Sequence, residues 1–167
     1  MRLLFLRAGI EVKGRNAFIL GTGGTSKTAA EVLRTLGAVS ITKVSRQPSG
    51  DEISYEQLYE NSESVEIIVN TTPVGMFPSI DASPVRLESF CNLCGVIDAV
   101  YNPICTRLIL EAKERKIKCS GGLFMLVAQA AYAYELFFDR ELPSEIIENT
   151  YLDILEKKEN IVLVGMP

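Results

Sequence analysis

The chain has 167 residues, of which 47% are hydrophobic and 23% are charged, and its formal net charge is -4. This balance is typical of an ordinary globular domain with a substantial core, and it excludes disordered and fibrous proteins. Acidic and basic residues are interleaved and form no basic stripe, which disfavours nucleic-acid binding.

The spacing of apolar residues alternates between short continuous runs and helical repeats. In chain order this predicts a strand at 17–20, a helix at 25–36, a strand at 40–44, a short helix at 55–59, strands at 65–69 and 95–100, a helix at 105–116, a strand at 117–119, and helices at 123–138 and 143–157. Strands that alternate with helices and lack hairpin turns favour an α/β fold of the Rossmann type, a doubly wound parallel sheet in three layers. Residues 1–158 are expected to form this single domain.

A glycine-rich turn joins the first predicted strand to the first long helix. In a dinucleotide-binding turn, the first glycine permits the bend, the second lets the backbone approach the pyrophosphate, and the third position must be small. Gly21, Gly23 and Ser26 occupy these places, and the amides from Gly24 through Thr25 to Ser26 are expected to hold phosphates at the positive end of the helix. The spacing is not that of a P-loop, which disfavours ATP. A merely structural turn is the alternative.

The end of the second strand selects the cofactor. NAD-binding domains place an acidic side chain there for the ribose hydroxyls, whereas this chain has Ser45 and Arg46. A guanidinium pairs well with a 2′-phosphate, which a carboxylate would repel. The sequence therefore predicts NADP as the cofactor, and the alternative for Arg46 is a solvated surface charge.

Other features indicate the setting of the protein. The longest uncharged stretch, 120–134, is shorter than the roughly 20 residues that span a bilayer, and 1–7 lacks a secretory cleavage site, so we expect no membrane segment and a cytoplasmic location. Cys91 and Cys94 match half of a zinc site or a redox pair. The chain has no histidine and no second such pair, so reduced thiols are the preferred interpretation.

Three further motifs follow the carboxyl ends of predicted strands, at 70–76 (NTTPVGM), 98–108 (DAVYNPICTRL) and 121–130 (GGLFMLVAQA). Together with the glycine turn and the Ser45-Arg46 pair, they resemble the NADP-dependent shikimate dehydrogenases over roughly 9–155. Thr22 and Lys27 depart from the residues usual in that turn, as Ser45 and Gln47 do beside Arg46. The resemblance implies reduction of 3-dehydroshikimate to shikimate.

The resemblance also implies roles for individual residues. The loop that contains Asn70, Thr71, Thr72 and Val74 would lie along the cofactor. Gly122 and Met125 would border the nicotinamide, Tyr101 would face the substrate, and Gln129 would hydrogen-bond a substrate hydroxyl. For Met125 the alternative is a core position, and for Gln129 it is a bond to a neighbouring loop. Asn70 and Asp98 are also candidates for anchoring loops.

In that family the catalytic lysine and aspartate belong to an N-terminal domain, whose signature segments do not occur here. Residues 1–13 resemble the linking helix before the cofactor domain. We therefore expect a chain that binds NADP without turning over shikimate alone; the alternatives are a stand-alone regulatory Rossmann module and a quinate dehydrogenase. A homodimer through an exposed apolar face is a further expectation. The tail at 159–167 resembles the first strand of a shikimate kinase, and an irregular tail or an edge strand is the alternative.

Overall fold

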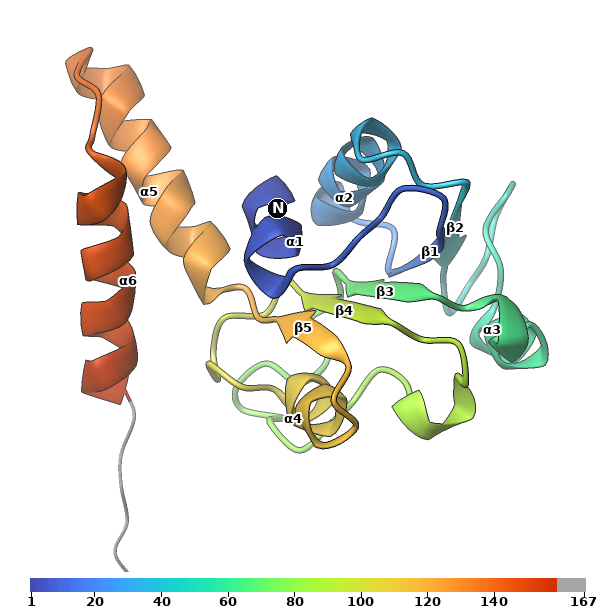
Figure 1. Cartoon of the computed structure of the whole chain (residues 1–167). Coiled ribbons are helices and arrows are strands. Elements are labelled where there is room, and N and C mark those ends of the chain that lie inside the picture. The colour runs from blue at the N-terminus through green and yellow to red at the C-terminus, as the bar shows by residue number, and fades with distance from the viewer. Residues whose placement is uncertain (159–167) are drawn as a thin grey trace, which may run out of the picture. The chain divides into compact units, whose positions relative to one another are not determined.

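The computed structural model of the chain describes residues 1–158 (Figure 1). They divide into two compact units, the first ending at Met125 and the second starting at Leu126. The elements in chain order are α1 (Arg2–Ala8), β1 (Asn16–Leu20), α2 (Gly24–Thr35), β2 (Ser40–Val44), α3 (Tyr55–Glu60), η1 (Ser62–Ser64), β3 (Ile67–Asn70), η2 (Leu87–Ser89), β4 (Gly95–Asp98), α4 (Arg107–Glu114), β5 (Lys118–Ser120), α5 (Leu123–Phe138) and α6 (Ser144–Lys158).

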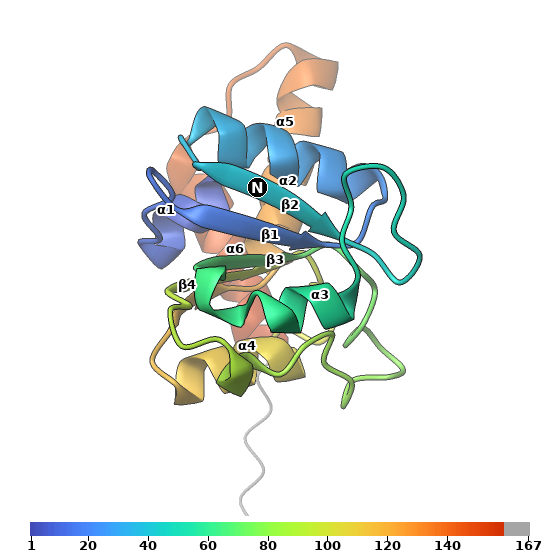
Figure 2. The same cartoon turned by 90° about the vertical axis from the view of Figure 1, so that its right-hand side faces the viewer.

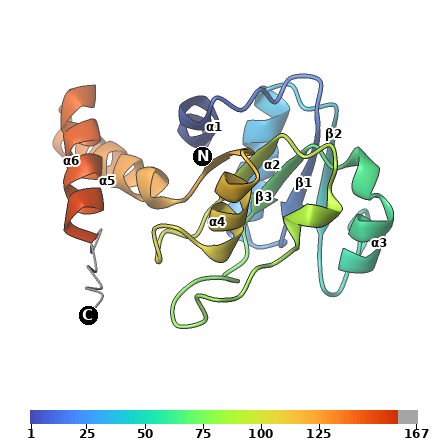
Figure 3. The same ribbon diagram turned by 60° about the horizontal axis from the view of Figure 1, so that its bottom comes forward.

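The first unit is built on one five-stranded sheet in the order β2-β1-β3-β4-β5, and all its pairings are parallel. Figures 1 and 2 show α2 on one face of this sheet and α3 and α4 on the other. Figure 3 shows the same order of layers from below, with the sheet between α2 and α4. The predicted doubly wound Rossmann-type sheet in three layers is therefore confirmed.

The strand order creates a switch point at β1. The chain runs from β1 to β2 on one side and then returns past β1 to β3 on the other. Loops that leave the carboxyl ends of β1 and β3 therefore diverge, and ligands of open parallel sheets bind in the crevice between such loops. Leu20 pairs with Asn70 in register, and the Thr71 amide donates to the Leu20 carbonyl over 2.9 Å.

The core explains why the sheet is stable between its helices. All four residues of β3 and of β4 are buried, as expected for strands of a parallel sheet covered on both faces; each strand is apolar up to a buried polar residue at its end, Asn70 or Asp98. Phe18, Leu20 and Ile68 pack with Leu58 and Leu108 from the helices on one face. The outer strand β2 is only partly buried along most of its length.

Most predicted boundaries differ from the structure by one or two residues, and two of these differences have a clear local reason. The strand predicted to reach Val100 ends at Asp98, whose carboxylate accepts the Val100 amide and turns the chain out of the sheet. The helix predicted from Cys105 starts at Arg107, because the Thr106 side chain caps it by accepting the Ile109 amide.

Several expectations concern what the chain does not contain. Among residues 1–158, no helix is both long and apolar enough to cross a membrane. The same residues contain no group of three or more potential metal ligands. All four cysteines are free, and the Cys94 thiol lies 3.2 Å from the Glu66 carbonyl oxygen. The predicted tail strand lies outside the described residues, so the proposed domain limit and kinase resemblance stay predictions.

Candidate nucleotide-binding site

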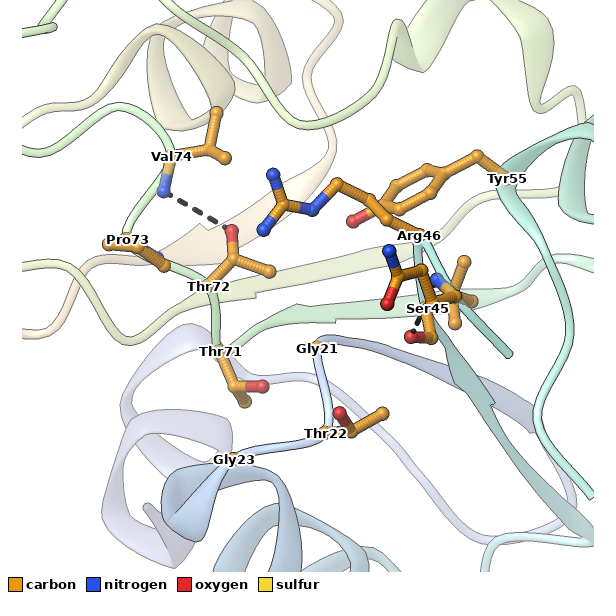
Figure 4. Close-up of a pocket in the computed structure, with 12 residues that line it drawn as sticks. Gly21, Thr22, Gly23, Ser45, Arg46, Tyr55, Thr71, Thr72, Pro73 and Val74 are labelled. Carbon is orange, nitrogen blue, oxygen red and sulfur yellow. Dashed lines mark hydrogen bonds between the residues drawn. The ribbon is translucent and has the colours of Figure 1, made fainter. Parts of the chain in front are cut away.

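A pocket of about 760 Å³ lies at the switch point, beyond the carboxyl ends of β1, β2 and β3 (Figure 4). Three chain segments and one helix residue form it. Its lining residues are Gly21, Thr22, Gly23, Val44, Ser45, Arg46, Gln47, Tyr55, Thr71, Thr72, Pro73 and Val74. This lining carries one positive charge and no carboxylate, so the pocket suits an anionic ligand.

The glycine turn forms the floor of the pocket in the view of Figure 4. Gly21 has a φ of 97°, which side-chain-bearing residues rarely adopt. A Cβ there would also lie 3.0 Å from the Thr72 Cγ2 atom and 3.1 Å from the Thr71 Oγ1 atom. Gly21 is therefore required both by its backbone conformation and by the close approach of the loop after β3.

The start of α2 is open to a ligand. Gly23 is the N-cap and supplies no capping side chain, and Gly24 and Thr25 are exposed. Ser26 is fully buried, and its hydroxyl donates to the Gly23 carbonyl over 2.6 Å. The burial of Ser26 explains why a small residue is needed at the third position, and the uncapped amides before it leave positive potential for a phosphate.

The end of β2 supplies the positive side chain. The Val44 carbonyl accepts the Gly21 amide over 2.9 Å, which joins the two strand ends. Ser45 accepts the Gln47 amide through its hydroxyl over 3.2 Å and so shapes the turn that presents Arg46. Figure 4 shows Arg46 reaching from this turn towards Thr72.

The loop after β3 is held by a buried hydrogen-bond network. The Thr71 hydroxyl donates to the Leu20 carbonyl over 2.7 Å. The Asn70 carboxamide oxygen accepts the Thr72 amide over 3.0 Å and the Thr72 hydroxyl over 2.7 Å. Asn70 itself is fully buried, so it shapes the pocket wall through Thr72; the cofactor contact predicted for Asn70 stays untested.

Asp98 anchors this network from the neighbouring strand. One carboxylate oxygen accepts the Asn70 amide nitrogen over 2.9 Å and the Val100 amide over 3.0 Å, and the other accepts the Thr106 hydroxyl over 2.6 Å. Burial raises the pKa of Asp98, and these three donors act against that rise. Asp98 therefore ties the loop after β3 to the loop after β4 and to the start of α4.

The other predicted residues lie outside the pocket lining. Tyr101 is exposed, and Met125 is partly buried. Gly122 has a packing reason for being glycine, because a Cβ there would overlap the carbonyl oxygen of Ala99. Gln129 is exposed in the second unit. The nicotinamide and substrate contacts inferred for these residues remain predictions.

The structure adds Val44, Gln47, Tyr55 and Pro73 to the predicted lining. Gln47 and Pro73 adjoin predicted residues and were within reach of sequence reasoning. Tyr55 was not, because it belongs to the next helix and its approach to Arg46 depends on how the intervening loop returns.

Comparisons with known proteins identify relatives of the chain. No family model matches the chain. The chain is 32% identical over 149 residues to the NADP-dependent shikimate dehydrogenase of Clostridium beijerinckii, covering 85% of this chain and 55% of that enzyme. Across the curated relatives compared, the share of their length that the chain spans lies between 55% and 61%.

Solved structures extend the likeness to the fold. The chorismate mutase/shikimate 5-dehydrogenase fusion protein from Clostridium acetobutylicum matches with a TM-score of 0.82 at 32% identity, over 93% of this chain and 59% of that one. Shikimate 5-dehydrogenase from Thermus thermophilus, solved with NADP(H) and shikimate, matches with a TM-score of 0.72 at 30% identity, over 89% of this chain and 60% of that one. With its glycine turn and Arg46 pocket, the chain belongs to the shikimate dehydrogenase family and spans about three fifths of the length of those members.

Proposed function

We propose that this chain is the NADP-binding part of a shikimate dehydrogenase, which reversibly reduces 3-dehydroshikimate to shikimate. The observation that carries the proposal is the pocket at the switch point, where the Gly21 turn and Arg46 face the same space. The Clostridium beijerinckii relative is an NADP-dependent shikimate dehydrogenase, and the Thermus thermophilus enzyme was solved with NADP(H) and shikimate, which supports the same cofactor and substrate class here.

The residues present fit the cofactor. The open start of α2 suits the pyrophosphate, and Arg46 suits the 2′-phosphate, since no carboxylate lines the pocket to compete with it. When bound, NADPH supplies the hydride for carbonyl reduction. The chain's own contribution is to hold the adenosine end and to place the Thr72–Val74 wall, which Asn70 and Asp98 fix in position.

Cofactor binding tests the proposal directly. In calorimetric titrations of the purified chain, we expect NADP to bind at least about tenfold more tightly than NAD, because a charge-assisted hydrogen bond to the 2′-phosphate contributes roughly 1.5–3 kcal/mol. Equal affinities, or no binding of either cofactor, would contradict the proposal.

Turnover separates binding from catalysis. We expect no NADPH formation from shikimate by this chain alone, because the proton-transferring lysine and aspartate implied by the family resemblance have no counterparts in its motifs. Binding without turnover supports a cofactor-binding part, whereas NADPH formation by the chain alone would refute that division of labour. If the chain is a stand-alone regulatory module, it should bind nucleotide, and adding a shikimate-binding partner chain should not produce dehydrogenase activity.

Apolar side chains on the second unit favour self-association, in line with the expected homodimer. Leu136 and Phe137 are 83% and 82% exposed, and Tyr132 and Phe138 are also exposed. Several large apolar side chains exposed on one helix commonly mark an interface. Light scattering after size exclusion should show a dimer, and the double substitution Leu136→Glu with Phe137→Glu should give a monomer. A wild-type monomer at all accessible concentrations would contradict the dimer.

The proposed setting is the cytosol, where an NADP-dependent biosynthetic reduction takes place and where four unpaired cysteines stay reduced. A shikimate or quinate preference depends on residues that contact the substrate ring. Tyr101 and Gln129 are the proposed contacts of this chain.

A further inference from the structure

Two local features hold Tyr55 in the lining of the pocket: backbone hydrogen bonds to β2 and a helix-capping box. The loop that starts at Arg46 returns to β2, where the Ile53 amide donates to the Lys43 carbonyl and the Ser45 amide donates to the Ile53 carbonyl, each over 2.9 Å. Ser54 then starts α3 with a capping box: its hydroxyl accepts the Gln57 amide and its amide donates to the Gln57 side chain. Tyr55, the first residue of α3, is therefore held beside Arg46.

The two ends of the Tyr55 side chain have different surroundings. Its ring is partly buried and packs against the core cluster that contains Val44 and Leu58. Its hydroxyl forms no hydrogen bond with another residue in 1–158. Burial raises the pKa of Tyr55 and the positive charge of Arg46 lowers it, so the two side chains interact electrostatically. The hydroxyl is a proton donor at neutral pH.

We propose that the Tyr55 hydroxyl and the Arg46 guanidinium together bind the 2′-phosphate of NADP, which makes Tyr55 a second specificity-determining residue. This inference rests on the proposed function. It depends on the placement of both side chains on the pocket lining, with the Arg46 chain and the Tyr55 ring on the same side of the pocket in Figure 4.

The chemistry of a phosphate monoester explains why two groups are needed. Its three terminal oxygens accept several hydrogen bonds, and a planar guanidinium bonds two of them at once. A tyrosine hydroxyl suits a remaining oxygen. Arg46 makes no ion pair with a described carboxylate, so its charge is available to the ligand. The neutral 2′-hydroxyl of NAD offers neither the charge nor the extra acceptors.

Titration with fragments of the cofactor isolates this subsite. Adenosine 2′,5′-bisphosphate carries the 2′-phosphate, and adenosine 5′-monophosphate lacks it. Tyr55→Phe keeps the ring and removes only the hydroxyl, so packing against Val44 and Leu58 is preserved. We expect this variant to bind the bisphosphate about tenfold more weakly, as removal of a hydrogen bond to a charged group implies, and to bind the monophosphate like the wild type.

Tyr59 provides a matched control on the same helix. Its hydroxyl accepts the Arg86 amide over 3.0 Å, and its ring stacks on Phe90 with centroids 5.5 Å apart. Tyr59 does not line the pocket. Tyr59→Phe should lower thermal stability without changing the ratio of the two nucleotide affinities.

The outcomes distinguish this inference from the proposed function. If Tyr55→Phe binds both fragments like the wild type while Arg46→Ala loses the bisphosphate, Tyr55 has only a packing role and the inference is overturned. If both affinities fall together in Tyr55→Phe, the hydroxyl acts on the whole pocket, which also overturns it. If wild type shows no preference for the bisphosphate, the proposed NADP specificity itself fails, and the inference fails with it.

Discussion

Replacing Arg46 with aspartate is expected to weaken NADP binding by about a hundredfold or more and to leave NAD binding nearly unchanged. The substitution removes the charge-assisted hydrogen bonds to the 2′-phosphate, each worth roughly 1.5–3 kcal/mol, and places a second negative charge beside that phosphate. NAD has no phosphate at this position, so the substitution removes no hydrogen bond to NAD and adds no repulsion against a phosphate there. A carboxylate after the second strand is also the arrangement that favours NAD.

The measurement is calorimetric titration of each cofactor with wild type and variant at two salt concentrations. Added salt should reduce the difference for NADP, because part of it is screened charge repulsion. Arg86→Asp is the matched control, since it makes the same change of charge on an exposed residue that does not line the pocket. An equal loss of affinity for NADP and NAD in the Arg46 variant would show that the guanidinium does not bind the 2′-phosphate.

Replacing Asp98 with alanine is expected to destabilise the fold by about 3 kcal/mol or more. Three buried donors, Asn70, Val100 and Thr106, lose their acceptor at once, and each unsatisfied group costs roughly 1–3 kcal/mol. Removal of the buried carboxylate returns part of this cost, because the charge no longer needs to be desolvated. Urea denaturation followed by circular dichroism measures the change.

Asp81→Ala is the control, because Asp81 is exposed and its side chain has no described hydrogen bond; its effect should stay near zero. Asp98→Asn keeps one acceptor and tests the charge. The pKa of Asp98 is raised in the folded state, so its carboxyl group keeps its proton up to a higher pH in the folded state than in the unfolded state. The stability of wild type relative to Asp98→Asn should therefore fall as the pH rises from about 4 through that raised pKa. A difference that rises over this range would contradict the assignment.

The spacing of apolar residues was sufficient to predict the order of strands and helices and the parallel sheet that they form. Ser40–Val44 and Leu123–Phe138 have the predicted bounds. In the first, apolar Ile41 and Val44 follow the Gly37 stop, and the second is a long, mostly apolar run that starts after Gly122. Two of the boundaries that shifted depend on single side-chain hydrogen bonds. Asp98 ends β4 early and Thr106 delays α4, and neither bond shows in a hydrophobic pattern.

The site divides in the same way. The predicted cofactor contacts that line the pocket each follow a strand whose carboxyl end the sequence identified: Gly21, Thr22, Gly23, Ser45, Arg46, Thr71, Thr72 and Val74. Their contacts with the cofactor stay predictions. Tyr55 lies on a helix start, and only the return of the 46–52 loop to β2 brings it to Arg46. Such tertiary placement has no periodic signal. The capping box of Ser54 and Gln57 fixes the start of α3, but such a pattern predicts a helix and not which side chains lie beside it.

Every residue that lines the pocket falls between Gly21 and Val74, in one uninterrupted segment that ends just after the third strand. The residues proposed to discriminate NADP from NAD therefore all lie in one portion of the chain that recombination can exchange as a block. Asp98, which holds that portion through its hydrogen bond with Asn70, lies outside it and does not line the pocket. Exchange of this segment is therefore expected to change cofactor preference, while the hydrogen bonds of Asp98 to Val100 and Thr106 keep the neighbouring loop in place.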